Sequence, residues 1–453
     1  MDFTLEVFQN EFVGPGTAAM DAILTVTAEG GGAPVPGETA AEVLIIDTSG
    51  SMGTPPNRIM AARQAAAEAI DTVRDGVLFA VVAGTDRAHP IFPTWGPGLA
   101  VADPTTRAAA KEALRSLKAG GGTGMSTWLM AARELFASSP TTMRHAILLT
   151  DGDNWEDPWL LDEALRMCRG QFQVDCRGVG TDWVVDELRT IATALMGTVD
   201  IIPEPEQMPD VFRGLMERSM GRAVGSSALR VWCPLEATVN FVRQVAPDVE
   251  DLTSRGVVAD ERTTVFALGS WGAEARDFHL SVSIPPNEVG IELLAARVAL
   301  VAEGEVVAQA PVRVVWTEDD AVSARINREV AHYTGQAELS ASIQEGLEAL
   351  KAGDEHTATT KLGRATQLAA ESGHDGTVRL LRKVVDIDDE RTGTVRIRRH
   401  IAKVDEMALD TRSTRTVRVR TPKAEPMALD TRSTVTVRVP PGSKRAPSDP
   451  SAS

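Results

Sequence analysis

The sequence predicts an α/β fold: a doubly wound, mostly parallel sheet of the Rossmann-like kind, with an antiparallel β-sandwich, a small α-helical region and a disordered tail. Three observations predict it. Apolar runs of strand length alternate with helical patterns over residues 42–220. Short strand patterns separated by turn residues fill residues 225–317. The chain then ends in a basic segment that repeats itself.

Composition allows several folded units and excludes one class of function. The chain has 453 residues, 43% hydrophobic and 24% charged, which is enough apolar material for two or three separate cores. Its net charge of −17 argues against nucleic-acid binding, because a surface that contacts phosphates needs clustered Lys and Arg.

The cysteines and the apolar runs bear on location. Cys168, Cys176 and Cys233 show no CxxC spacing, so we interpret them as buried free thiols and not as disulfides or zinc ligands. The start "MDFTLEVFQNEFVG" lacks the basic residues and the unbroken apolar stretch of a signal peptide. No apolar run reaches the roughly 18 residues of a membrane span. We therefore expect a cytoplasmic protein with no membrane contact.

Residues 42–220 carry the α/β pattern. Apolar runs predict strands over residues 42–47, 76–84, 144–152, 172–180 and 198–203. Apolar residues at helical spacing predict helices over residues 57–73, 103–117, 124–139, 158–170, 186–195 and 208–220. The second of these helices begins with an N-cap, Asp103, followed by a proline. Such alternation predicts parallel strands with helices on both faces of the sheet.

The flanking segments predict two further units. Residues 1–41 contain two alternating strand patterns, which we expect to join the β-sandwich of residues 225–317, so that the α/β unit is an insertion. Residues 320–386 are helical, with two amphipathic helices about the turn "AGD" at 352–354, spaced like one tetratricopeptide hairpin. The hairpin is either a small helical cap or a peptide-binding groove.

Residues 387–453 predict a flexible basic tail. "KVDEMALDTRSTRTVRV" at 403–419 returns as "KAEPMALDTRSTVTVRV" at 423–439, and "RTGTVRI" at 391–397 looks like a worn third copy. Residues 391–453 hold 14 Lys and Arg against 6 Asp and Glu, a net charge of +8 that leaves −25 for the rest of the chain. A polar, Thr-rich segment of this kind does not fold alone.

The stretch "VLIIDTSGSMG" at 43–53 begins a candidate metal site. Asp47, Ser49 and Ser51 follow a buried strand, Thr123 lies in the glycine loop "GGGTGMST", and Asp151 ends another strand. Ligands bind at the carboxyl ends of strands in open α/β sheets. Two carboxylates and three hydroxyls suit Mg²⁺ or Mn²⁺ and leave a position for an acidic group from another molecule. That incomplete shell favours binding over catalysis.

Enzymatic alternatives fit less well. The serine-hydrolase pattern G-x-S-x-G fails because Ser49 stands two residues before Ser51, and the three loops contain no histidine to act as a base. A Mg²⁺-dependent phosphohydrolase remains as the alternative, with Asp47 as nucleophile and Asp151 and Asp153 on the metal. Its usual second acid, two residues after the nucleophile, is replaced by Ser49.

The five residues resemble the von Willebrand factor type A domain with its metal-ion-dependent adhesion site. The pattern D-x-S-x-S, the threonine loop and the last acid are all present, over roughly residues 42–220. The resemblance implies that the three hydroxyls contact the ion directly or through water, that Asp47 and Asp151 hold it partly through waters, and that a partner's Asp or Glu completes the shell. The whole layout resembles bacterial intracellular proteins of this class, which are non-enzymatic interaction or assembly modules.

The tail suggests a second kind of interaction. Four threonines, each with an aliphatic residue three positions on, resemble sites that forkhead-associated domains read once a Ser/Thr kinase has phosphorylated them: Thr414, Thr416, Thr434 and Thr436. Each phosphate adds nearly two negative charges to a basic segment. The alternatives are a duplicated low-complexity tail that lies on the acidic body, or edge strands that add to a partner's sheet.

Overall fold

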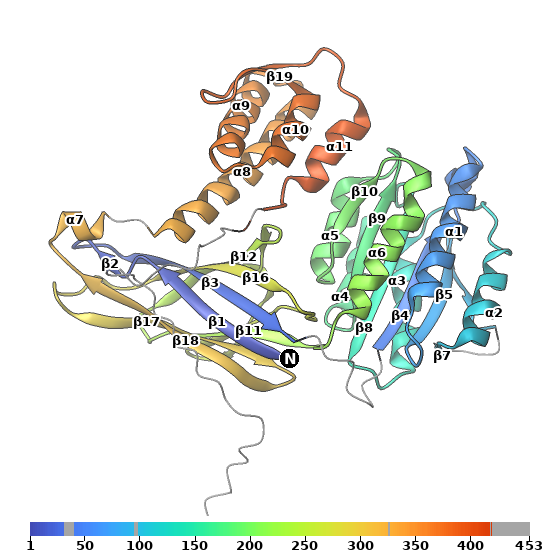
Figure 1. Cartoon of the computed structure of the whole chain (residues 1–453), viewed down its shortest axis with the longest axis horizontal. Helices are drawn as coiled ribbons and strands as arrows, with labels where there is room; N and C mark the ends of the chain where they lie inside the picture. The colour runs from blue at the N-terminus through green and yellow to red at the C-terminus, as the bar shows by residue number, and fades with distance from the viewer. Residues whose placement is uncertain (31–39, 95–97, 325–326, 417, 419–453) are drawn as a thin grey trace, which may run out of the picture.

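The computed structural model describes residues 1–30, 40–94, 98–324, 327–416 and 418. Figure 1 shows three parts: the α/β unit, the β-sandwich and a helical region above them. None of the helices in these described ranges is long and apolar enough to cross a membrane.

The α/β unit is built on a seven-stranded sheet in the order β10-β9-β8-β4-β5-β6, with β7 paired to β5. The strands from β10 to β5 pair in parallel, whereas β6 and β7 pair antiparallel with β5. Their bounds are β4 Ala40–Asp47, β5 Leu78–Gly84, β6 Ala88–Phe92, β7 Ala100–Val101, β8 Met143–Thr150, β9 Gln173–Val179 and β10 Val199–Ile202. The predicted mostly parallel sheet is confirmed, and the short antiparallel edge strands were not predicted.

Helices cover both faces of this sheet (Figure 1). One hydrophobic core joins the sheet to α1, α2 and α6, and a second joins its other face to α3, α4 and α5. The helices are α1 Asn57–Thr72, α2 Pro104–Leu114, α3 Met125–Ala137, α4 Pro158–Cys168, α5 Val185–Ala194 and α6 Met208–Met220, with 3₁₀ turns η1 Gly50–Gly53 and η2 Pro205–Gln207. Because both faces are covered, β4 is buried along its whole length, as its continuous apolar run predicts.

The β-sandwich consists of a five-stranded sheet, β1-β3-β16-β12-β13, and a six-stranded sheet, β14-β15-β11-β17-β18-β2. The first sheet contains β1 Asp2–Gln9, β3 Ala19–Glu29, β12 Thr238–Ala246, β13 Glu250–Asp251 and β16 Ala275–Ser283. The second contains β2 Phe12–Val13, β11 Ser227–Trp232, β14 Gly256–Asp260, β15 Thr263–Ala267, β17 Glu292–Ala302 and β18 Glu305–Trp316, and the 3₁₀ turn η3 is Thr253–Arg255. Since β3 pairs with β16, the α/β unit lies in the sequence between strands of one sheet.

The helical region packs against the sandwich through one long helix. The region contains α7 Asp320–Ser323, α8 Arg328–Lys351, α9 Glu355–Glu371 and α10 Asp375–Val384. Val330 and Tyr333 of α8 pack against strands of the sandwich, while the second half of α8 packs on α9 and α10. The turn between α8 and α9 coincides with "AGD". Their apolar faces are covered within the region, which favours the helical-cap interpretation of the hairpin.

The prediction of a flexible tail from residue 387 is wrong for the part of it that the structure describes. β19 Val385–Asp389 pairs with β20 Thr394–Ile397, so the supposed third repeat, residues 391–397, forms the turn and the second strand of a hairpin, and α11 Lys403–Arg412 follows it. Val395 and Leu409 are buried in the core of the helical region. The segment is locally polar, but these few apolar side chains find partners elsewhere in the chain, and composition alone does not reveal that. Residues 419–453 lie outside the described residues.

Candidate metal centre

The carboxyl ends of β4 and β8 bring two of the predicted loops together. β4 pairs in parallel with β8, so Asp47 and Asp151 follow neighbouring strands at the same edge of the sheet. The threonine loop, which lies second in the sequence, is tied to the first loop by the backbone: Gly50 N–H donates to Gly121 O at 3.0 Å, and Gly120 N–H donates to Thr48 O at 2.8 Å. All three loops therefore meet at one place.

A chain of hydroxyls links the loops. Ser49 Oγ lies 2.9 Å from Ser51 Oγ, and Ser51 Oγ donates to Asp151 Oδ1 at 2.6 Å. Ser49 and Asp151 are buried, whereas Ser51 is partly open to solvent. The oxygens of the first and third loops are thus within contact of one another, with Ser51 nearest the surface.

Asp47 anchors the first loop and is fully buried. Its Oδ1 accepts from Ser49 N–H at 2.7 Å and its Oδ2 accepts from Thr150 Oγ1 at 2.5 Å. Burial raises the pKa of Asp47 to about 6; the hydrogen bonds from Thr150 and Ser49 act against this, and the charge of Asp151 adds to it. These two hydrogen bonds fix the start of the first loop and tie it to the end of β8.

Gly152 leaves space between the hydroxyls of two loops. A Cβ atom at this position would lie 3.2 Å from Ser51 Oγ and 3.7 Å from Thr123 Oγ1. A side chain here would occupy the gap that those two hydroxyls border. Hydroxyl oxygens such as these two are of the kind that hard divalent cations such as Mg²⁺ or Mn²⁺ accept as ligands. In the described ranges no three His, Cys, Asp or Glu side chains gather as a metal site, so this hydroxyl-rich cluster is of a different kind.

Arg58 was missed by the sequence analysis. This residue of α1 donates from NH1 to Asp151 Oδ2 at 2.8 Å and from NH2 to Asp182 Oδ2 at 3.2 Å. The Asp151 side chain is fully buried, so the guanidinium supplies the positive charge that balances it. Its sequence signal is slight: Arg58 is the first charged residue after the D-x-S-x-S loop.

Two exposed tryptophans follow the Asp151 loop in the sequence, and one of them contacts the threonine loop. Trp155 and Trp159 are 80% and 58% exposed, and Trp155 N–H donates to Thr123 O at 3.0 Å. Two nearby carboxylates fix the threonine loop and the start of α3: Asp86 accepts from Gly122 N–H, and Glu156 accepts from the N–H and hydroxyl of Ser126. Exposed aromatic side chains at the rim of a site are typical of protein-binding surfaces.

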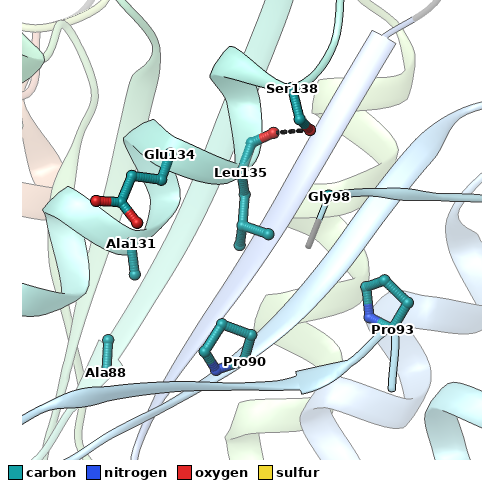
Figure 2. A pocket seen from close by; sticks show the side chains of 8 residues that line it. All are labelled: Ala88, Pro90, Pro93, Gly98, Ala131, Glu134, Leu135 and Ser138. Carbon is teal, nitrogen blue, oxygen red and sulfur yellow. Dashed lines mark hydrogen bonds between the residues drawn. The ribbon is translucent and has the colours of Figure 1, made fainter. Parts of the chain in front are cut away.

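A pocket elsewhere on the α/β unit is separate from this site. Figure 2 shows it between β6 and the C-terminal half of α3. The residues that line it are Ala88, Pro90, Pro93, Gly98, Ala131, Glu134, Leu135 and Ser138. Ser138 Oγ donates to Leu135 O. Among the described residues that line the pocket, Glu134 carries the one charge. The pocket contains none of the predicted site residues.

The predicted phosphorylation sites lie on another part of the molecule. Thr414 O accepts from Val249 N–H at 2.7 Å, and Thr416 Oγ1 donates to Val245 O at 2.7 Å. Both threonines therefore lie against the sandwich near β12. Thr434 and Thr436 lie outside the described residues.

Comparison with known proteins agrees with this architecture. The model of the von Willebrand factor type A domain matches residues 43–154, and that of the von Willebrand factor type A C-terminal domain matches residues 367–413. A solved von Willebrand factor type A protein from Catenulispora acidiphila is 47% identical, with a TM-score of 0.88 over 92% of this chain and 97% of its own. The ArnB paralog VWA2 from Sulfolobus acidocaldarius shares the fold at 16% identity, with a TM-score of 0.59 over 91% of this chain and 98% of its own. No curated protein matches the sequence.

Proposed function

The chain belongs to the von Willebrand factor type A family, whose domains generally mediate protein–protein interactions, and on that premise we propose that it is a non-enzymatic scaffold protein that binds a partner through a divalent metal ion. Domains of this family often bind such an ion. The proposed ligands are two carboxylates and three hydroxyls at the sheet edge: Asp47, Ser49, Ser51, Thr123 and Asp151. We propose Mg²⁺, or Mn²⁺, as the ion, because every donor is oxygen.

One observation carries the proposal: oxygens from separate loops border the gap beside Gly152. By family resemblance the hydroxyls contact the ion directly or through water, and the carboxylates act partly through waters. The bound ion would attract an Asp or Glu side chain of the partner and accept it as a ligand. Trp155, which is exposed and whose backbone N–H donates to Thr123 O, would pack against apolar groups beside that acid.

The phosphohydrolase alternative is disfavoured by the state of Asp47. A nucleophilic carboxylate needs an oxygen that reaches the phosphorus atom of a substrate. Asp47 is fully buried, so neither of its oxygens is open to a substrate from solvent.

Partner capture tests the proposed function. We expect Ser51→Ala and Thr123→Ala to abolish the Mg²⁺-dependent part of partner binding, because each removes a hydroxyl beside the gap. The measurement is affinity capture from native lysate with Mg²⁺ or with EDTA, followed by quantitative mass spectrometry. Asp153→Ala, at an exposed position in the third loop, is the matched control and should bind as the unaltered chain does. Asp47-dependent release of phosphate from generic substrates would contradict the proposal and favour the hydrolase.

We also propose phosphorylation of Thr414, Thr416, Thr434 and Thr436 by a Ser/Thr kinase, with a forkhead-associated domain as reader. Thr416 supports a regulatory effect, because its hydroxyl donates to two carbonyls, of Val245 and Pro247, that would repel a phosphate. Mass spectrometry of the protein from its native cells tests this, and threonines that stay unmodified under every growth condition would remove the idea. The cytoplasmic location expected from the sequence stays a prediction.

A further inference from the structure

The first repeat, residues 403–419, docks on all three parts of the molecule as far as the structure describes it. Figure 1 shows α11 at the junction between the helical region and the α/β unit, near β10 and α5. From there the chain continues to the sandwich, where the backbone of Arg415 forms an isolated antiparallel β-bridge with that of Asp248. The surface that receives it, which we name the repeat cradle, has these polar contact residues: Arg189, Asp200, Val249, Asp277, Gln344 and Lys351.

Apolar anchors hold the start of the docked segment. Met407 and Ala408 are buried in the core that α3, α4 and α5 share with the sheet. Leu409 is fully buried in the core of the helical region. Three consecutive residues therefore contribute to two separate hydrophobic cores. A segment that served only as a linker would not need such burial.

Asp410 is a buried acid with three partners in the cradle. Its carboxylate pairs with Arg189 of α5 and, at 3.4 Å, with Lys351 of α8. Gln344 Nε2 donates to its Oδ1 at 3.1 Å. A buried carboxylate with two cations and an amide around it is recognised as an acid, so the cradle selects for Asp at this position.

Three arginines of the first repeat pair with acids of the cradle. Arg412 Nε donates to Asp200 Oδ1 at 3.0 Å. Arg418 donates from Nε and NH2 to the two oxygens of Asp277, both at 2.8 Å, and Asp277 is 2% exposed. Bidentate arginine–carboxylate pairing adds geometric specificity to the contact. Arg415 also pairs with Asp200.

The second repeat, residues 423–439, preserves nearly all of these contact residues. The two repeats are identical at 13 of 17 positions. The matching residues of the second repeat are Met427, Ala428, Leu429, Asp430, Arg432, Thr434, Thr436 and Arg438. Val435 stands where the first repeat has Arg415, so the second repeat could form only one of the two ion pairs that the first repeat makes with Asp200. Pro426 replaces Glu406, whose N–H donates to Ala402 O in the first turn of α11, so the second repeat lacks this one backbone hydrogen bond.

We propose that the repeat cradle is a peptide-binding site with two alternative ligands in one chain, the first repeat and the second repeat. The first repeat occupies the cradle in the structure, and the second repeat replaces it there when the first is displaced. Both carry the same anchor sequence, Met-Ala-Leu-Asp-Thr-Arg-Ser-Thr, twenty residues apart. A short tether keeps the second repeat near the cradle at an effective concentration of about millimolar, which favours exchange within one chain over exchange between chains.

Photo-crosslinking of the full chain tests the exchange. A benzophenone amino acid at Val249, whose N–H bonds Thr414 O, should capture peptides of the first repeat in the otherwise unaltered chain. In the double variant Leu409→Asp with Asp410→Ala, we expect the ratio of crosslinked second-repeat peptides to crosslinked first-repeat peptides to rise by about tenfold or more. The matched variant Leu429→Asp with Asp430→Ala should leave the pattern of the otherwise unaltered chain. A first-repeat variant that gives no crosslink to residues 423–439 would overturn the proposal.

Two further arms keep the test decisive. Mixing isotope-labelled and unlabelled first-repeat variants shows whether crosslinks join different copies, and such mixed crosslinks would overturn the assignment to one chain.

If the first-repeat variant does not fold, synthetic peptides at millimolar concentration are added to the unaltered chain, and hydrogen exchange of residues 403–416 is measured. Peptide 423–439 should raise that exchange, at an affinity about three- to tenfold below that of peptide 403–419, since it lacks both the Arg415 ion pair and the backbone hydrogen bond of Glu406. Peptide 423–439 with Asp430→Ala should have no effect, and a parent peptide that also has none would overturn the proposal.

Discussion

Gly152→Ala is expected to lower the affinity for Mg²⁺ and Mn²⁺ by about 100-fold while the protein remains folded. The added methyl group would lie 3.2 Å from Ser51 Oγ and 3.7 Å from Thr123 Oγ1, inside the gap that the proposed ion needs. Gly152 has no left-handed backbone conformation, so alanine introduces no backbone strain. Isothermal titration calorimetry measures the affinity, and circular dichroism checks the fold.

The control for this variant is another glycine of the same site. Gly120 lies in the threonine loop with open space around its Cβ position, so Gly120→Ala should bind the metal as the unaltered chain does. A Gly152→Ala protein that binds Mg²⁺ with unchanged affinity would show that the ion does not lie between Ser51 and Thr123.

Arg58→Gln should act in the opposite direction on the same measurement. Arg58 pairs with Asp151 at 2.8 Å and so neutralises one of the two carboxylates proposed for the metal. A unit charge about 6–7 Å from a divalent ion repels it by roughly 5 kcal/mol at an effective dielectric constant near 20. Arg58 is partly exposed, so solvent screens part of this repulsion, and we expect its removal to raise the affinity by about tenfold or more. Opposite shifts from Arg58→Gln and Gly152→Ala cannot both come from general destabilisation.

His145→Ala is expected to cost about 3–5 kcal/mol of unfolding free energy. His145 is buried in the α/β unit, with Nδ1 2.8 Å from Glu42 Oε2 and Nε2 3.0 Å from Asp175 Oδ2. Removing the imidazole leaves two carboxylates buried without the cation that lies between them. Such a loss is a large part of the 5–15 kcal/mol that typically holds a domain folded.

The pH dependence of this loss has a definite sign. Burial lowers the pKa of His145, but Glu42 and Asp175 outweigh it, so the net shift is upward from 6.5. The stabilisation is then complete below about pH 6.5 and is lost as pH rises through the higher folded pKa. For Asp175, burial raises the pKa, but His145 and nearby arginines lower it well below 3.8. Its stabilisation is present above about pH 4 and is lost in stronger acid.

Urea unfolding of both proteins across pH 4–9 measures this effect. The difference in unfolding free energy between unaltered and His145→Ala proteins should be largest between about pH 4 and 6.5 and should shrink in alkali. His89→Ala, at an exposed position on β6, is the control and should change the free energy by less than about 0.5 kcal/mol. A difference that grows with rising pH would contradict the charged state assigned to His145.

Much of the fold and the candidate site could be predicted because the signals are local. The buried parallel strands are continuous apolar runs, so "EVLIID" alone predicts β4. The rule that ligands bind at the carboxyl ends of parallel strands then predicts that the loops holding Asp47 and Asp151 meet. The edge strand β6 was missed because "AHPIF" is short, half exposed and contains a proline, which weakens the strand pattern.

The sequence by itself determined the strands, the helices and the oxygen-bearing loops. The reason is that burial imposes a regular spacing and a share of apolar residues on each strand or helix separately. The tertiary structure alone decided that Arg58 pairs with Asp151, and that Gly152 leaves a gap between Ser51 and Thr123. It also decided that the first repeat folds, because Leu409 and Asp410 are stabilised by groups more than fifty residues away. Contacts across such distances depend on packing in three dimensions, and no local pattern of residue types encodes them.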